Sequence, residues 1–499
     1  MSVSRPRVGE DLWPLLGLTL LAAALRLPTL GLQSLWYDEA FTPVHVLHAS
    51  LGATLRAVVH SENTPPLWYV LEWGVTRVLG TGEVALRLLS ALAGVATVPV
   101  VWAIGRELSG RRAAMIGAAL VASSPLFVWY SQEARAYALF VLLLALTVLC
   151  FLRAEREPTP RRLAAFALSG SLALLSHYFA VFMLIPMALW LLLDHTGDRT
   201  AEDAGARLPA VLGALGALTA VGLALIPLVV AQGGHGTQWI GRWALSARIE
   251  AIPQYYLTGA SGAPLGRGVQ ALVGLIVLAG LAVTLWPRAH GGLEGREREG
   301  AGIVLAIGAC GVLIPLALAL FGADYLAPRN LVGAMVPLTA GLAVLLGARG
   351  TGMWGMVLGV LLAVAFLALS VDVNLSPRLQ RGDWRGVARV LRGGAPDRVI
   401  TTVELGAAPL EHYLPPLHNL ARGASVRVSE IDETGYAPLR VGAGEPPVPG
   451  FRLAERRDVH GLTVYRFRSA SPRVASEARL RGAVITLAHP EVLVPGSRP

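Results

Sequence analysis

Long apolar stretches separated by short polar segments fill the first three quarters of the chain. A transmembrane helix needs about 20 consecutive, mostly apolar residues. The apolar pattern therefore predicts a polytopic α-helical membrane protein. We expect about eleven transmembrane helices, at residues 12–32, 84–105, 113–130, 135–152, 163–177, 178–194, 208–231, 269–287, 301–321, 331–348 and 353–373.

One further apolar segment, PPLWYVLEWGVTRVL at residues 65–79, is short for a membrane span and contains Glu72 and Arg77. We expect it to form a helix on the outer surface of the membrane, within a first outer loop at residues 33–83. Trp68, Tyr69 and Trp73 are then expected at the membrane interface, where such side chains are enriched.

Arginines between the apolar stretches set the expected orientation, because basic residues are enriched in short cytoplasmic loops. If the eleven stretches alternate across the membrane, the arginine clusters fall on one side. The N-terminus is then cytoplasmic and residues 33–83 are extracytoplasmic. The arginines concerned are Arg5, Arg7, Arg106, Arg111, Arg112, Arg153, Arg156, Arg161, Arg162, Arg199, Arg207, Arg288, Arg296, Arg298 and Arg349.

The composition changes after residue 373. Helix-like and strand-like segments alternate there, and the segment GLTVYRFR has the alternating pattern of a strand. We therefore predict two domains: a transmembrane domain at residues 1–373 and a small extracytoplasmic α/β domain at residues 374–499.

Composition agrees with a membrane protein. Only 15% of the residues are charged, whereas soluble domains carry charge on about a quarter of theirs. The net charge of +9 does not indicate nucleic-acid binding, because basic residues flanking membrane helices report topology and lipid contact. The first apolar stretch continues past a small-residue site at Ala22–Ala24, which favours an uncleaved helix over a signal peptide.

The segment SLWYDEAFT places Asp38 and Glu39 directly after the first apolar stretch. A charged group near lipid is costly unless it is paired or lines a water-filled cavity. A carboxylate in such a cavity is able to act as a general base towards a hydroxyl group. The alternative interpretation is an acid that faces lipid headgroups or pairs with an arginine.

WYDEAFT resembles the acidic signature of the GT-C superfamily of membrane glycosyltransferases, and in particular the protein O-mannosyltransferase and lipid A aminoarabinose transferase group. The resemblance continues along the chain in the same order as in that group. It is carried by HSENTPPLWY (60–69), GEVALRLLSALAG (82–94, with Arg87), YSQEARAYAL (130–139) and, more weakly, SHYFAVF (176–182) and YLAPRNLVGAMVPL (325–338).

The resemblance implies an enzyme that transfers a hexose, pentose or similar sugar, such as mannose, from a polyprenyl-phosphate carrier to a protein, lipid or glycan acceptor, with inversion at the sugar. Asp38 would be the general base, and Glu39 would position the acceptor or the sugar. The departing phosphate needs a fixed cation, and the planar fork of an arginine suits it. Arg329 is the first candidate for this cation and Arg135 the second. Interfacial snorkelling of Arg329 and a local pair between Arg135 and Glu133 are the structural alternatives.

Four further residues are candidates for substrate binding. Glu133 matches the second acidic position of the group. His60 and Glu62 precede the proline pair at residues 65–66 and are expected to line the same cavity, although a loop histidine is more often only solvated. Tyr130 suits either a sugar site or an interfacial belt.

No clustered spacing of cysteine, histidine or acidic residues indicates a metal site, and no nucleotide-binding motif is present. The resemblance implies no cofactor, although some distant GT-C relatives use a divalent cation. Two other functions remain open. The first is a transporter or lipid flippase, and the second is an inactive relative whose C-terminal domain binds glycans. Transporters often contain repeats and broken helices near mid-membrane, and the sequence displays neither.

Overall fold

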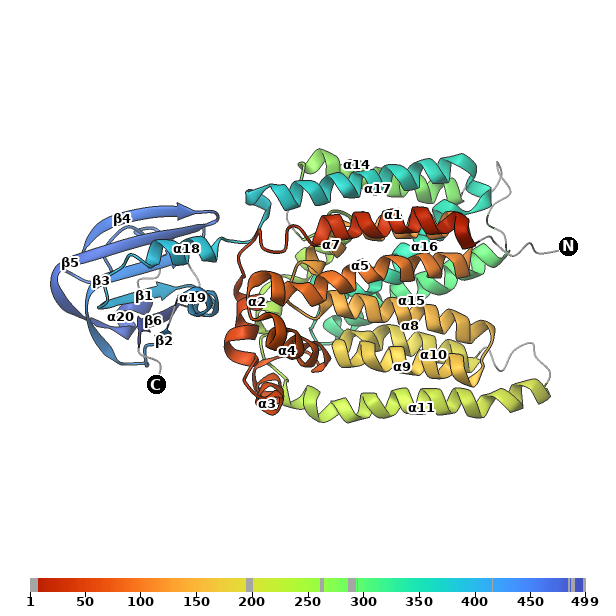
Figure 1. Cartoon of the computed structure of the whole chain (residues 1–499), viewed down its shortest axis with the longest axis horizontal. Helices are drawn as coiled ribbons and strands as arrows, with labels where there is room; N and C mark the ends of the chain where they lie inside the picture. The colour runs from red at the N-terminus through yellow and green to blue at the C-terminus, as the bar shows by residue number, and fades with distance from the viewer. Residues whose placement is uncertain are drawn as a thin grey trace. The chain divides into compact units, whose positions relative to one another are not determined.

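The computed structural model describes residues 8–193, 201–260, 264–285, 293, 295–414, 416–482, 485 and 490–496. Arg5, Arg7, Arg199 and Arg288, which support the expected topology, lie outside these ranges. The chain divides into two compact units: unit 1 comprises residues 1–30 and 54–375, and unit 2 comprises residues 31–53 and 376–499. Figure 1 follows the chain through both units.

Unit 1 is helical. Its longer helices are α1 (Val8–Arg26), α5 (Glu83–Leu108), α6 (Arg111–Ser123), α7 (Pro125–Ser131), α8 (Tyr137–Arg156), α9 (Pro160–Ser176), α10 (Val181–Leu193), α11 (Ala201–Ala231), α14 (Arg267–Leu285), α15 (Gly295–Leu320), α16 (Met335–Gly347) and α17 (Gly352–Leu375). Its shorter segments are α3 (Leu51–Ser61, of which the first three residues belong to unit 2), α4 (Leu67–Leu79), η2 (Tyr178–Ala180), α12 (Gln238–Arg242), α13 (Leu245–Thr258), η4 (Pro328–Ala334) and η5 (Arg349–Thr351).

Each apolar stretch of the sequence coincides with one of these helices or with a consecutive pair. Within the described residues, six helical segments are long and apolar enough to cross a membrane, or seven if α6 and α7 form one bent span. The count of about eleven spans therefore stays a prediction. The first helix differs from its expected range of 12–32: α1 ends at Arg26, just before Pro28, because proline and the residue before it disfavour helix continuation.

Helix α4 is 13 residues long, about 20 Å at the usual helical rise, which is too short to cross a bilayer of about 30 Å. The expected interfacial position of its aromatic residues is wrong for Trp68 and Tyr69, because both are buried within the protein. The hydroxyl of Tyr69 is hydrogen-bonded to that of Thr64 at 2.9 Å. Glu72 is buried too, and burial raises the pKa of its carboxyl to about 8, which keeps the group neutral near pH 7.

The chain bends by 55° between α6 and α7. Arg26, which is fully buried, reaches this bend from α1. Its guanidinium donates hydrogen bonds to the carbonyls of Ala122 at 2.9 Å and Val121 at 3.1 Å, and to the hydroxyl of Ser131 at 3.1 Å. These bonds satisfy carbonyl groups near the end of α6, which a helix end leaves without intrahelical partners.

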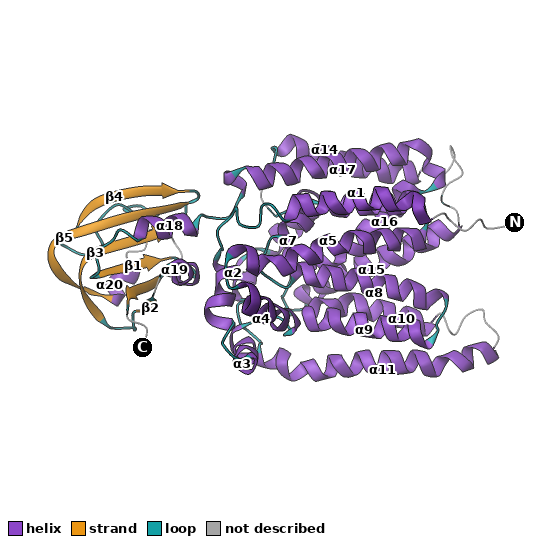
Figure 2. Cartoon of the chain, in the orientation of Figure 1, coloured by secondary structure: helices purple, strands orange, loops and turns teal. Residues whose placement is uncertain are grey.

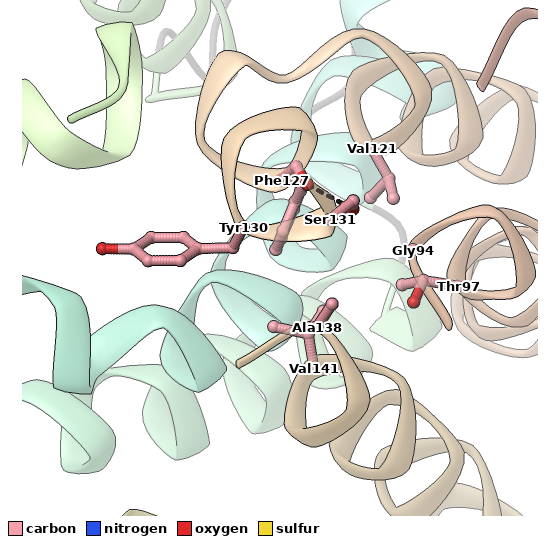
Figure 3. Close-up of a pocket in the computed structure, with 8 residues that line it drawn as sticks. All are labelled: Gly94, Thr97, Val121, Phe127, Tyr130, Ser131, Ala138 and Val141. Carbon is pink, nitrogen blue, oxygen red and sulfur yellow. Dashed lines mark hydrogen bonds between the residues drawn. The ribbon is translucent and has the colours of Figure 1, made fainter. Parts of the chain in front are cut away.

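A small cavity of about 10 Å³ lies beside this bend (Figure 3). It is lined by residues of α5, α6, α7 and α8, and that volume is close to the minimum for a single water molecule. The ring of Tyr130 points away from the other labelled residues in Figure 3. This cavity is a packing defect at the bend and is too small for a substrate.

Unit 2 contains a six-stranded sheet with the order β2-β6-β1-β3-β5-β4 (Figure 2). Its strands are β1 (Arg398–Thr402), β2 (Leu417–Asn419), β3 (Ser425–Gly435), β4 (Arg452–Val459), β5 (Leu462–Ser476) and β6 (Glu491–Pro495). Only β1 and β3 pair in parallel; the other neighbouring strands are antiparallel. The predicted C-terminal α/β fold is confirmed in these elements.

Alternating residues of the sheet face two hydrophobic clusters, as the two-residue period of a strand requires. On β1, Val399 belongs to one cluster, together with Phe467. Ile400 belongs to the other, which includes Trp384 of α18 (Trp384–Leu391) and Leu410 of α19 (Ala407–Tyr413). The remaining helical segments of unit 2 are α2 (Tyr37–Phe41), η1 (Thr42–Val46), η6 (Pro377–Leu379) and α20 (Glu477–Gly482).

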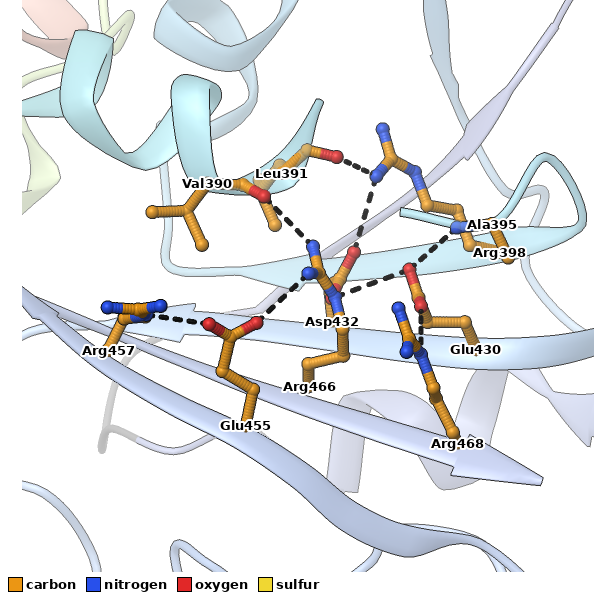
Figure 4. Close-up of polar contacts among 10 residues, drawn as sticks. All are labelled: Val390, Leu391, Ala395, Arg398, Glu430, Asp432, Glu455, Arg457, Arg466 and Arg468. Carbon is orange, nitrogen blue, oxygen red and sulfur yellow. Dashed lines mark hydrogen bonds and ion pairs between the residues drawn. The ribbon is translucent and has the colours of Figure 1, made fainter. Parts of the chain in front are cut away.

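Charged side chains connect the central strands (Figure 4). Arg466 of β5 contacts Asp432 of β3 at 2.9 Å and Glu455 of β4 at 3.2 Å, and it also donates to the carbonyl of Val390 at 3.0 Å. Asp432 is fully buried. Since a buried charge without a partner is strongly destabilising, we interpret this network as part of the framework of unit 2.

Residues 31–53 group with unit 2, although the sequence suggested a single boundary near residue 373. Hydrogen bonds explain this grouping. The hydroxyl of Ser34 donates to the carbonyl of Gly382 at 3.1 Å and accepts from the backbone amide of Trp384 at 3.0 Å, and the amide of Leu35 donates to the hydroxyl of Tyr413 at 2.8 Å. The partners are more than 340 residues apart in sequence, so no local pattern reveals them.

Candidate active site

Unit 1 contains a cavity of about 590 Å³, within the size range of pockets that bind small molecules and cofactors. One part of its wall is apolar and comes mainly from α9, α10, α11 and α15. The other part is polar and comes from loops and short segments between helices. The polar and aromatic residues of the lining include Asn63, Thr64, Arg135, Tyr137, His177, Tyr178, Gln232, Trp239, Tyr325, Arg329 and Asn330.

Arg329 lies in η4 and lines this cavity. Its guanidinium carbon is 4.7 Å from the ring centroid of Trp239, close enough for a cation–π interaction. The contact orients the guanidinium without neutralising its positive charge. Trp239 therefore supports a cation in the cavity wall.

Arg135 lines the same cavity from the loop between α7 and α8. It pairs with Glu62, with N–O distances of 3.2 Å and 3.3 Å from its two terminal nitrogens to the two carboxylate oxygens. The sequence suggested Glu133, in the same loop, as a partner of Arg135. In the structure the two-pronged contact of Arg135 is with Glu62, which is 73 residues away in the sequence. Glu62 thus reaches the cavity through Arg135, and the adjacent Asn63 and Thr64 are in the lining.

His177 lines the same cavity as Arg135 and Arg329. Its ring stacks on Phe140 with a centroid distance of 4.8 Å, and its Nδ1 accepts a hydrogen bond from the backbone amide of Phe179 at 3.2 Å. The two candidate phosphate-binding arginines therefore belong to one polar region, although 194 residues separate them in sequence.

Glu133 and Tyr130 lie next to this polar region. Glu133 is buried. The charges of Glu133 and Arg329 both act on Tyr130 and on Tyr255 of α13. The rings of Tyr130 and Tyr137 are in contact at 4.8 Å. Glu133 and Tyr255 are thus part of the electrostatic surroundings of Tyr130, and no motif in the sequence indicated Tyr255.

Gln232, just after the end of α11, is a second residue that the sequence did not suggest. Its amide nitrogen donates to the carbonyls of Val58 at 2.9 Å and Thr64 at 3.1 Å, and its amide oxygen accepts from the hydroxyl of Tyr178 at 2.7 Å. It lines the cavity and links three segments of its rim. The only sequence signal is a polar residue at the end of an apolar stretch, which many unrelated helix ends share.

Asp38 and Glu39 lie in α2, within unit 2. Their environments differ. Glu39 is fully buried, and one of its carboxylate oxygens accepts a hydrogen bond from the amide of Trp36 at 3.4 Å, so its carboxylate caps the first turn of α2. Asp38 is only partly buried. Of the two adjacent acids, Asp38 is therefore the more accessible one.

His60 is exposed at the end of α3 and is outside the lining of the cavity, in contrast to its expected position. Within the part of the chain that the structure describes, no three histidine, cysteine or acidic side chains come together in a way that would hold a metal ion.

Comparisons with known proteins bear on the identity of this fold. Residues 63–223 match the model of the dolichyl-phosphate-mannose-protein mannosyltransferase family. This region includes Glu133, Arg135 and His177. A comparison with the sequences of curated proteins finds no significant match.

Solved structures of ArnT from Cupriavidus metallidurans are similar over almost the whole chain. The form bound to undecaprenyl phosphate has 12% sequence identity and a TM-score of 0.54, and the match covers 92% of this chain and 98% of ArnT. The apo form has 12% identity, the same coverage of both chains and a TM-score of 0.53. At this identity the likeness demonstrates a common fold. The chain thus has the fold of ArnT, and its residues 63–223 resemble the protein mannosyltransferase family, in agreement with the resemblance that the sequence motifs carry.

Proposed function

We propose that this protein is a glycosyltransferase that takes a sugar from a polyprenyl-phosphate carrier and transfers it to an acceptor at the outer face of the membrane. The observation that carries the proposal is the cavity of unit 1. It combines an apolar wall formed by membrane-type helices with a polar region that contains Arg135 and Arg329. A lipid with an anionic phosphate head and a long hydrocarbon chain matches both parts.

The donor's phosphate binds at the arginines, and its prenyl chain lies along the apolar residues of α10, α11 and α15. Arginine binds phosphate through two parallel hydrogen bonds. Arg329 is the principal phosphate ligand in this proposal, because it lines the cavity and its guanidinium is held against the ring of Trp239. ArnT, which has the same fold, has been solved with undecaprenyl phosphate bound, in agreement with a donor of this class.

The acceptor group loses its proton to Asp38, and the resulting nucleophile attacks the anomeric carbon of the sugar. The bond between that carbon and the phosphate oxygen breaks, and the lipid phosphate leaves with the electron pair. A direct displacement of this kind inverts the anomeric configuration. Arg329 stabilises the negative charge that develops on the phosphate, which is usually a large contribution to catalysis. Asp38 is preferred to Glu39 as the base because the carboxylate of Glu39 is buried and caps α2.

The test is sugar transfer from a radiolabelled polyprenyl-phosphate sugar to membrane acceptors by the full-length protein. We expect Asp38→Asn to reduce transfer at least a hundredfold, the lower range for loss of a general base, and to leave donor binding intact. Asp458→Asn serves as the matched control, because Asp458 is an exposed aspartate on β4 that contacts Arg456 and Thr463. Full transfer by Asp38→Asn would refute the role of Asp38. Movement of an intact solute across sealed vesicles, without transfer, would instead indicate a transporter.

A further inference from the structure

Helix α13 holds the segment that carries Arg329 at two points. Near its start, Arg248 binds Asp324 through two hydrogen bonds, of 2.6 Å and 2.7 Å, from its two terminal nitrogens to the two carboxylate oxygens. Near its end, the hydroxyl of Tyr256 donates to the carbonyl of Leu331 at 2.8 Å. Asp324 precedes Arg329 in the chain and Leu331 follows it, so the two contacts flank the arginine.

Arg248 makes a third bond in this region, from its Nη1 to the carbonyl of Leu326 at 2.8 Å. Its side chain is only 3% exposed, so solvent does not compete effectively for these bonds. Asp324 in turn accepts a hydrogen bond from the amide of Leu326 at 3.3 Å, which shapes the turn before η4. Hydrogen bonds to Arg248 hold the pKa of Asp324 below its usual range, so the pair is ionised at neutral pH.

We propose that Arg248, with Asp324, is a positioning pair that fixes Arg329 in the cavity wall for binding the donor's phosphate. Arg248 does not line the cavity, so it acts through the loop that carries Arg329. A two-pronged pair between a buried arginine and a partly buried aspartate, four residues before the seven-residue 3₁₀ segment η4, restricts the backbone from which Arg329 projects. Displacements of about 1 Å at a substrate-binding group reduce rates by up to about a hundredfold. Loss of this restraint is therefore expected to impair the function of Arg329.

This inference rests on the proposed function, and a double-mutant cycle between Arg248 and Arg329 tests it. The quantity measured is the affinity of the full-length protein in nanodiscs for undecaprenyl phosphate. We expect Arg248→Ala to weaken binding about tenfold, within the usual range for coupled sites. In the Arg329→Ala background, Arg248→Ala is expected to cause almost no further loss, because the group that it positions is absent. In transfer assays, the KM for the donor should rise, and kcat should fall as well, because Arg329 also stabilises the charge that develops on the departing phosphate.

Three further variants make the test specific. If Arg248→Ala does not fold, Asp324→Asn takes its place in the cycle, because it removes only the charge of the partner. Exchange of the two residues, Arg248→Asp with Asp324→Arg, should restore part of the affinity. Arg111→Ala is the matched control: Arg111 pairs with Asp11 at 2.6 Å but lies outside the cavity, so donor affinity should not change.

Two of the three possible outcomes distinguish failure of the positioning role from failure of the proposed function. Independent, additive losses in the cycle would overturn the positioning role and leave the proposed function intact. A wild-type protein that binds the lipid phosphate but transfers no sugar would overturn the proposed function, while the cycle would still decide the positioning role from affinities alone. A wild-type protein that does not bind the lipid phosphate would overturn both.

Discussion

Arg26 and Arg135 are both largely buried arginines, and their partners distinguish their roles. The guanidinium of Arg26 donates to backbone carbonyls and to Ser131 at the bend between α6 and α7. Arg135 pairs with a carboxylate and lines the cavity. Motif resemblance indicated Arg135 and Arg329 in advance, because they lie within recognisable segments. It did not indicate the partners Glu62 and Trp239, because sequence separation conceals which side chains meet.

The pair between Arg135 and Glu62 leads to a prediction at this scale. Arg135→Ala leaves the buried carboxylate of Glu62 without its cation, so we expect a loss of stability of about 3–5 kcal/mol, as for other broken buried pairs. The double variant Arg135→Ala with Glu62→Ala should be less destabilised than the sum of the two single variants. Thermal unfolding of the detergent-solubilised protein measures both effects, and additive losses would contradict the pairing.

At the scale of elements, hydrophobic periodicity located the long helices well, because a membrane span requires a long apolar stretch whatever its neighbours are. It placed the end of α1 too late, since Leu27, Leu30 and Leu32 extend the apolar pattern past Arg26, where the helix ends. It also assigned Trp68 and Tyr69 to the interface, because hydropathy does not distinguish a side chain facing lipid from one buried against protein. Hydrogen bonds to residues distant in sequence attach residues 31–53 to unit 2. No local sequence pattern predicts these hydrogen bonds.

The attachment of α2 to α19 is open to test through Tyr413. Its hydroxyl accepts a hydrogen bond from the amide of Leu35, three residues before Asp38. We expect Tyr413→Phe to cost about 1 kcal/mol, a typical net value for one hydrogen bond, and to speed hydrogen exchange of the Leu35 amide. If α2 carries the catalytic base, kcat for sugar transfer should fall while donor affinity stays constant.

Tyr436→Phe is the control for this prediction, since Tyr436 is an exposed tyrosine of unit 2. Unchanged exchange at Leu35 in Tyr413→Phe would show that this hydrogen bond does not hold the segment.

On the scale of the whole molecule, the chain forms a helical unit and a sheet unit with separate hydrophobic interiors. The sequence predicted this division from the change in composition near residue 373. It did not predict the strand order, in which β6 inserts beside β1 and β1 pairs in parallel with β3. Pairings between strands that are not neighbours in sequence depend on the whole sheet, whereas periodicity describes each strand alone.

The interior of unit 2 implies a pH-dependent stability. Glu433 of β3 is buried, and burial raises the pKa of its carboxyl to about 8 from its ordinary value of 4.5. The folded state therefore retains a proton that the unfolded state releases, so the stabilisation is complete below about pH 4.5 and is lost as the pH rises through 8. We expect hydrogen exchange in the sheet of the full-length protein to indicate falling stability across this range, and a smaller fall in Glu433→Gln.

Glu445→Gln is the control, because Glu445 is exposed in the same unit and its replacement should leave the slope unchanged. An identical slope in wild type and Glu433→Gln would mean that Glu433 is ionised in the folded protein.

The central claim is that the cavity of unit 1 binds the phosphate of a polyprenyl carrier at its arginines. The most direct measurement is an experimental structure of the full-length protein with a polyprenyl-phosphate sugar bound. We predict phosphate oxygens at hydrogen-bond distance, about 2.7–3.2 Å, from the guanidinium of Arg329, and a prenyl chain in contact with α10 and α11. A phosphate bound elsewhere, with neither Arg329 nor Arg135 in contact, would contradict the account.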